Sequence, residues 1–64
     1  MSDFKSRLSE EKTQLDERKS KLGSFLGTEN FSKLPQVQQS LLNAQYGVMG
    51  AYSVILEERI LHLD

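Results

Sequence analysis

Residues 35–63 read PQVQQSLLNAQYGVMGAYSVILEERILHL, with apolar side chains recurring at the spacing of an α-helix. Three stripes follow this segment in steps of three and four residues. The first stripe is Leu34, Val37, Leu41, Gln45, Val48, Tyr52, Ile55, Arg59 and His62. The second is Leu42, Tyr46, Met49, Ser53, Leu56, Ile60 and Leu63; the third is Ala44, Gly47, Ala51 and Val54. The pattern predicts one long helix over about 35–63, which Pro35 starts because proline is tolerated in the first turn.

The beginning of the chain predicts another helix, mostly solvated, over about 3–26. Six Lys/Arg and five Asp/Glu are interspersed in the first 22 residues. Opposite charges four residues apart stabilise a helix by roughly 0.2–0.5 kcal/mol per pair. The apolar residues form only a thin seam, at Phe4, Leu8, Leu15 and Leu22.

The end of this helix has two possible positions. Gly23 suits a helix end because glycine adopts a left-handed conformation at little cost, but the helix can also continue to Gly27. Phe25 and Leu26 extend the same apolar face, so we favour the later end. A connector over 27–34 follows, with Phe31 expected to be tucked inward.

These segments predict an all-α fold with a single domain, 1–64. We expect a two-helix antiparallel hairpin with a long second helix, assembling into a homo-oligomeric helical bundle. The three stripes are wider than one thin seam can cover, and monomeric proteins rarely expose such a large apolar patch. The expected interface residues between copies are Leu41, Leu42, Gly47, Val48, Met49, Ala51, Ile55 and Leu56.

Composition excludes several classes of function. The chain has 64 residues, no cysteine and a formal net charge of −1. Disulfides, thiolate catalysis and Cys-ligated metals are therefore excluded, and general nucleic-acid binding is disfavoured because it needs a basic excess. The longest run without charge, residues 34–56, contains Pro35 and several glutamines, so we expect no membrane span. We also expect no signal peptide and a cytoplasmic location.

Catalytic and metal-binding patterns are lacking in the sequence. His62 is the one histidine, and with Glu58 four residues earlier it supplies half of a metal site at best. No nucleophile stands with a base, and no glycine-rich loop suits a phosphate. We therefore expect no enzyme activity, no metal and no cofactor.

Aromatic and cationic side chains are the candidates for ligand binding. These are Arg59, Tyr52, Tyr46, Lys19 and Lys33. The two tyrosines either pack in an interface or stack on a flat ligand such as a nucleobase. Arg59 lies on an apolar stripe, where an unpaired cation is costly. Its partner is either a carboxylate such as Glu11 or a ligand phosphate.

The glycines inside the second helix also have two interpretations. Gly47 and Gly50 each cost roughly 1 kcal/mol relative to alanine in a helix interior. Either they allow another helix to approach closely, or a ligand or partner backbone occupies the space of the missing side chains.

Residues 31–60 also carry a recognisable pattern. F-x-x-L-P spans Phe31 to Pro35, Q-Q-x-L-L follows at 38–42, and Y-x-x-I-L-x-x-R-I lies at 52–60. With Phe25-Leu26 upstream and the charged first helix, this resembles a family of very small phage-encoded helical-hairpin proteins. That family is described as related to an uncharacterised crAss-like phage protein.

The resemblance implies a phage accessory protein and no particular reaction. Small phage hairpins that oligomerise include sponges, which sequester the cyclic nucleotide signals of bacterial defence systems. One hypothesis is therefore an anti-defence homo-oligomer that binds a cyclic or linear nucleotide in the host cytoplasm. The alternative is a non-enzymatic inhibitor that blocks a host protein through a helix surface.

Overall fold

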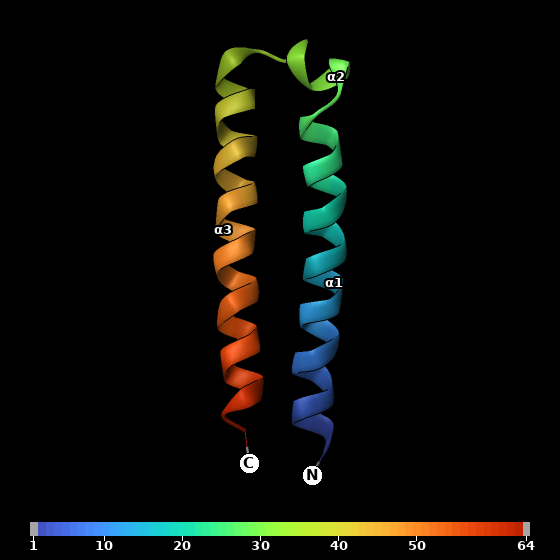
Figure 1. The fold of residues 1–64 in the computed structure, drawn as a ribbon, viewed down its shortest axis with the longest axis vertical. Coiled ribbons are helices and arrows are strands. Elements are labelled where there is room, and N and C mark those ends of the chain that lie inside the picture. Colours follow the sequence, from blue (N-terminus) through green and yellow to red (C-terminus); the bar gives the residue numbers. More distant parts are fainter. Residues whose placement is uncertain (1, 64) are drawn as a thin grey trace.

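The computed structural model describes residues 2–63, so residues 1 and 64 of the predicted domain lie outside the described residues. It contains the helices α1 (Ser2–Leu26), α2 (Glu29–Ser32) and α3 (Gln36–Leu61). α1 and α3 lie side by side and antiparallel, with α2 at the turn and both chain ends at the opposite end (Figure 1). The hairpin measures 48 × 14 × 12 Å. The predicted all-α hairpin is confirmed, and α2 is an addition within the expected connector.

α1 passes through Gly23 and ends after Leu26. The Gly27 N–H donates to the Ser24 carbonyl at 3.3 Å, and the Thr28 N–H donates to the Phe25 carbonyl at 3.0 Å. The later of the two expected helix ends is therefore the one observed.

Thr28 lies between α1 and α2 and forms hydrogen bonds with both helices. Its hydroxyl donates to the Phe25 carbonyl at 2.7 Å and accepts the Phe31 N–H at 3.2 Å, which caps α2. Phe31 is buried, and its ring meets the Phe25 ring edge to face with the centroids 5.9 Å apart. The inward position expected for Phe31 is thus confirmed.

The chain then enters α3 through Pro35, which has no side-chain capping hydrogen bond. The Gln39 side-chain amide, one turn into α3, donates to the Leu34 carbonyl at 2.8 Å and to the Ser32 carbonyl at 3.2 Å. One glutamine therefore satisfies two connector carbonyls and ties α2 to α3.

The core of the hairpin is a small leucine cluster. Leu8 and Leu15 of α1 meet Leu56 of α3, whose exposed fraction is 0%. Met49, Ile60 and Leu63 pack against this cluster. The second stripe of α3 therefore faces α1.

This orientation changes the role of three expected interface residues. Leu56 and Met49 lie in the core of the hairpin itself, and Leu42, on the same stripe, is half-buried. The reason is that the seam of α1 covers one stripe of α3, and these residues belong to that stripe.

The other two stripes of α3 remain exposed. We call this surface the outer face; its members are Val37, Leu41, Ala44, Gly47, Val48, Ala51 and Ile55. Its larger side chains are exposed by 54–66%. A Cβ added at Gly47 would meet no atom within 4 Å, so no helix of the same chain approaches there. The remaining expected interface residues all lie on the outer face, and self-association stays a prediction.

The hydropathy of the helices gives one further result. Within residues 2–63, no helix combines the length and the apolar character that crossing a membrane requires.

Candidate ligand-binding site

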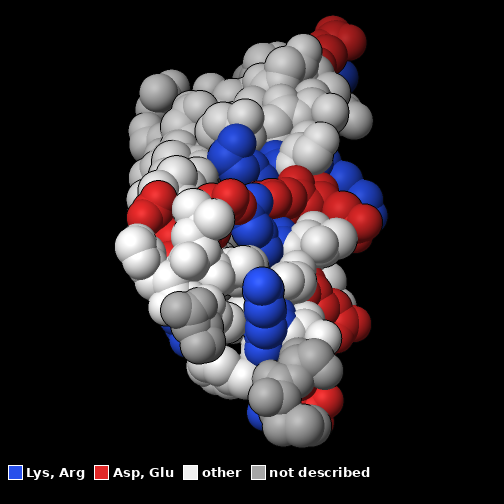
Figure 2. All heavy atoms as spheres, turned by 60° about the horizontal axis from the view of Figure 1, so that its bottom comes forward, with Lys and Arg blue, Asp and Glu red and all other residues white. Residues whose placement is uncertain are grey.

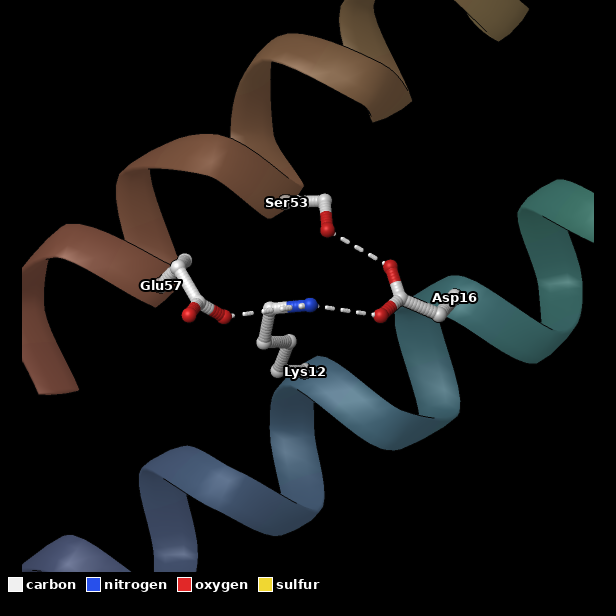
Figure 3. A network of polar contacts seen from close by, with 4 residues as sticks. All are labelled: Lys12, Asp16, Ser53 and Glu57. Carbon is white, nitrogen blue, oxygen red and sulfur yellow. Dashed lines mark hydrogen bonds and ion pairs between the residues drawn. The ribbon is translucent and has the colours of Figure 1, made fainter.

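A polar cluster links the two long helices and sets their register. Lys12 and Asp16 lie one turn apart on α1, and Ser53 and Glu57 lie one turn apart on α3 (Figure 3). The Asp16 carboxylate accepts a hydrogen bond from the Lys12 ammonium at 2.7 Å and another from the Ser53 hydroxyl at 2.6 Å. Lys12 Nζ also lies 3.6 Å from Glu57 Oε1. We call these four residues the clasp.

The clasp shifts the protonation of its members. The hydrogen bond from Lys12 lowers the pKa of Asp16 below the usual 3.8, and the Ser53 hydroxyl adds to the effect. The same contact raises the pKa of Lys12 above 10.5, against a smaller opposing effect of burial. Sequence analysis missed the clasp, although Ser53 was a visible polar interruption of an apolar stripe.

The clasp predicts a pH-dependent stability. A carboxyl group whose pKa is lowered by folding stabilises the fold above its unfolded pKa, and this contribution is lost as the pH falls through the folded pKa. We expect Asp16→Asn to lower the urea midpoint at pH 7, and the difference from wild type to disappear at about pH 2–3. Glu17→Gln, at the next and exposed position of α1, is the control. An Asp16→Asn deficit of equal size at both pH values would contradict the assignment.

Lys19 and Tyr46 form an aromatic–cation pair between the two long helices. The Lys19 ammonium lies 4.4 Å from the centroid of the Tyr46 ring and donates to the Tyr46 hydroxyl at 3.4 Å. Lys19 comes from α1 and Tyr46 from α3, and both are half-buried. An ammonium over an aromatic face is held by the negative face of the ring. The structure thus brings together two of the predicted binding residues.

Two glycines make room for this pair. A Cβ at Gly23 would lie 2.9 Å from Tyr46 Cε1, and a Cβ at Gly50 would lie 3.2 Å from Lys19 Cε. The missing side chain of Gly23 therefore leaves room for the Tyr46 ring, and that of Gly50 leaves room for the methylene groups of Lys19. This contact explains a glycine inside each long helix, where alanine is favoured by roughly 1 kcal/mol. Sequence analysis had considered Gly23 only as a helix end.

Tyr52 also bonds to a residue of α1. Its hydroxyl donates to a carboxylate oxygen of Glu11 on α1, and this bond raises the pKa of Tyr52 above 10.0. The positive charge of Arg59, two turns further along α3, lowers the pKa of Tyr52 by a smaller amount.

Arg59 itself is exposed. The ion pairs among the described residues involve Lys12 and His62, and Glu11 is used by Tyr52. The carboxylate expected to pair with Arg59 therefore serves a different group, because the rotation of the helices brings Glu11 to the phenol.

The five predicted binding residues do not form one site. Lys33 follows α2 at the connector, at the end of the hairpin opposite to the last turns of α3 that carry Arg59 (Figure 1). The structure brings together Lys19 and Tyr46, whereas Tyr52 bonds to Glu11 and Arg59 is exposed.

The charged surface favours recognition by individual cations. On the face that Figure 2 shows, Lys and Arg side chains are interleaved with Asp and Glu side chains. An alternating pattern of this kind creates no broad positive field, so an anionic group is recognised through local contacts. Within residues 2–63, no three His, Asp or Glu side chains gather as a metal site requires. The ring of His62 and the Glu58 carboxylate, 3.5 Å apart, are neighbours on one helix.

Comparison with known proteins identifies a family. The model of a protein family described as Sequestin matches residues 2–62, which is nearly the whole chain. No curated protein and no solved structure matches the chain.

Proposed function

The chain belongs to the Sequestin family, and from this premise we propose that it is a non-enzymatic, oligomeric binding protein that sequesters a nucleotide-type signal. The family name supports a sequestering role. The observation that carries the choice of ligand is the Lys19–Tyr46 pair, where a cation and an aromatic ring lie within 4.4 Å of each other. A nucleotide needs both groups, one for its phosphate and one for its base.

The chemistry of the Lys19–Tyr46 pair, with Arg59 as a further cation, suits such a ligand. A phosphate accepting a hydrogen bond from an ammonium or guanidinium gains roughly 1.5–3 kcal/mol. Stacking of a base on an aromatic side chain contributes about 1–3 kcal/mol. Lys19 with Tyr46 offers this combination between the two long helices, and Arg59 adds an exposed guanidinium.

Two further features complete the proposal. The exposed outer face supports assembly into a homo-oligomer, because removing such an apolar surface from water lowers the free energy. The resemblance of residues 31–60 to small phage-encoded hairpins supports an anti-defence role in the cytoplasm of a host cell, where the sequestered signal would be an immune one.

Arg59→Ala tests the role of the guanidinium. Arg59 is exposed, and the ion pairs within residues 2–63 do not include it, so we expect the melting temperature and the oligomer to be unchanged. Affinity for a bound nucleotide should fall at least about tenfold, the equivalent of 1.4 kcal/mol. Calorimetric titration of wild type and variant with a panel of cyclic and linear nucleotides measures this.

Lys33→Ala is the matched control, since it removes one positive charge at the other end of the hairpin. A loss of affinity equal to that of Arg59→Ala would indicate a general charge effect. If wild-type protein binds no member of the panel, the sequestration proposal fails.

Inhibition of a host protein is the second candidate function, and the outer face is the observation that favours it. An apolar helix face can lie in the groove of another protein. Mass spectrometry of the purified protein separates the candidates. A copurified nucleotide supports sequestration, whereas a stable stoichiometric complex with a host protein, without nucleotide, supports inhibition.

A further inference from the structure

We propose that two copies of the chain pair through their outer faces, with the α3 helices antiparallel and a two-fold axis at Val48. This inference rests on the proposed oligomer and names its contact surface and orientation. The occupant of the outer face is a second copy of this chain.

The first argument is that α3 is apolar on both sides. Residues 34–56 contain no Asp, Glu, Lys or Arg, and the core and the outer face lie on different sides of α3. Each of these two apolar sides is buried only where a neighbouring helix covers it. α1 covers only the core side, so a layer is missing over the outer face.

The second argument is the length of the outer face. Val37 to Ile55 span 18 residue steps of α3, about 27 Å at 1.5 Å per residue. About five helical turns of α3 therefore offer apolar contacts to a second copy of α3.

The third argument is the order of side-chain sizes about Val48. Seven residues before it is Leu41 and seven after it is Ile55, and both are more than half exposed. Four residues before it is Ala44, and four after it is Tyr52. In an antiparallel pair, Leu41 therefore faces Ile55 of the partner subunit and Tyr52 faces the small Ala44 of the partner subunit.

Gly47, next to Val48 in sequence, leaves space beside the axis, because no atom of the same chain lies within 4 Å of the position of its missing Cβ. A parallel pair would instead set each Arg59 beside the other Arg59 and leave a gap between the two alanines at position 44. A large side chain that faces a small one fills the space between the helices without such a gap.

Charge gives the same orientation. Residues 15–48, the half of the hairpin at the connector, hold four basic and three acidic residues, a net charge of +1. Residues 2–14 and 49–63 hold four basic and five acidic residues, a net charge of −1. An antiparallel pair sets each positive half against a negative half and opposes the α3 dipoles.

Cysteine cross-linking tests this arrangement directly, because the natural chain has no cysteine. Val48→Cys places two thiols at the axis, and mild oxidation should yield a covalent dimer on a non-reducing gel. Val37→Cys, of similar exposure, should not cross-link. In the proposed pair, position 37 of one copy faces position 59 of the other. The two residues at position 37 are therefore 22 helix residues apart, about 33 Å at 1.5 Å per residue, whereas a disulfide needs Cα atoms within about 7 Å.

Three further variants complete the experiment. A mixture of Leu41→Cys and Ile55→Cys chains should cross-link, while each variant alone should not. Val54→Cys measures collisional background, because Val54 is 61% exposed and the two residues at position 54 lie 12 helix residues apart in the proposed pair, about 18 Å at 1.5 Å per residue. We expect at least about tenfold more dimer from Val48→Cys, because only that pair meets the disulfide geometry.

Each opposing result overturns the proposal. Cross-linking of Val37→Cys as efficiently as Val48→Cys would indicate a parallel pair. Background levels at every position, with a monomer in light scattering, would leave the outer face for a different protein. The readout uses no nucleotide, so failure of nucleotide binding and failure of the pairing are distinguishable.

Discussion

Leu56→Ala should unfold most of the protein. Leu56 has an exposed fraction of 0% and joins the only two buried leucines of α1 among the described residues. Truncating a buried leucine to alanine costs about 2–5 kcal/mol, which includes the cavity left behind. A core of this size rarely supplies more than about 3–5 kcal/mol, so the loss approaches the whole free energy of unfolding. Urea denaturation followed by circular dichroism, at several protein concentrations, measures the change.

Val54→Ala is the control for this substitution, two residues away on the same helix. Val54 is 61% exposed, and alanine is the better helix former, so we expect the free energy of unfolding to change by less than about 0.5 kcal/mol. Equal effects of the two substitutions would mean that Leu56 is not at the centre of the core.

Val48→Glu should abolish self-association while leaving the hairpin helical. Val48 is 66% exposed in the hairpin, and glutamate is a good helix former, so the single chain tolerates the change. In the proposed pair, two carboxylates would meet at the axis without a counter-charge. Burying like charges in this way costs several kcal/mol. Analytical ultracentrifugation should give a mixture rich in oligomer for wild type and monomer for the variant.

Thr13→Glu adds the same charge to an exposed position of α1 and should leave the assembly intact. Circular dichroism of both variants separates loss of assembly from loss of folding. Wild-type protein that sediments only as a helical monomer would contradict the self-association prediction, as would a Val48→Glu variant that still associates.

The sequence by itself determined the elements of this fold. The apolar periodicity of residues 35–63 predicted the long α3, and the thin seam with alternating charges predicted α1. Pro35 and the Phe31 segment predicted the turn between them. Such patterns suffice because helix formation and capping depend on residues three or four apart, which the linear sequence displays.

The tertiary structure alone decided which side of each helix meets the other. Three stripes of α3 were eligible, and the one with Leu56 faces α1, which leaves Val48 outside. The pair of Lys19 with Tyr46 joins residues 27 apart, and that of Glu11 with Tyr52 joins residues 41 apart. Such contacts depend on the rotation and register of two packed helices. Periodicity within one helix does not encode these two quantities, because they follow from the packing of both surfaces at once.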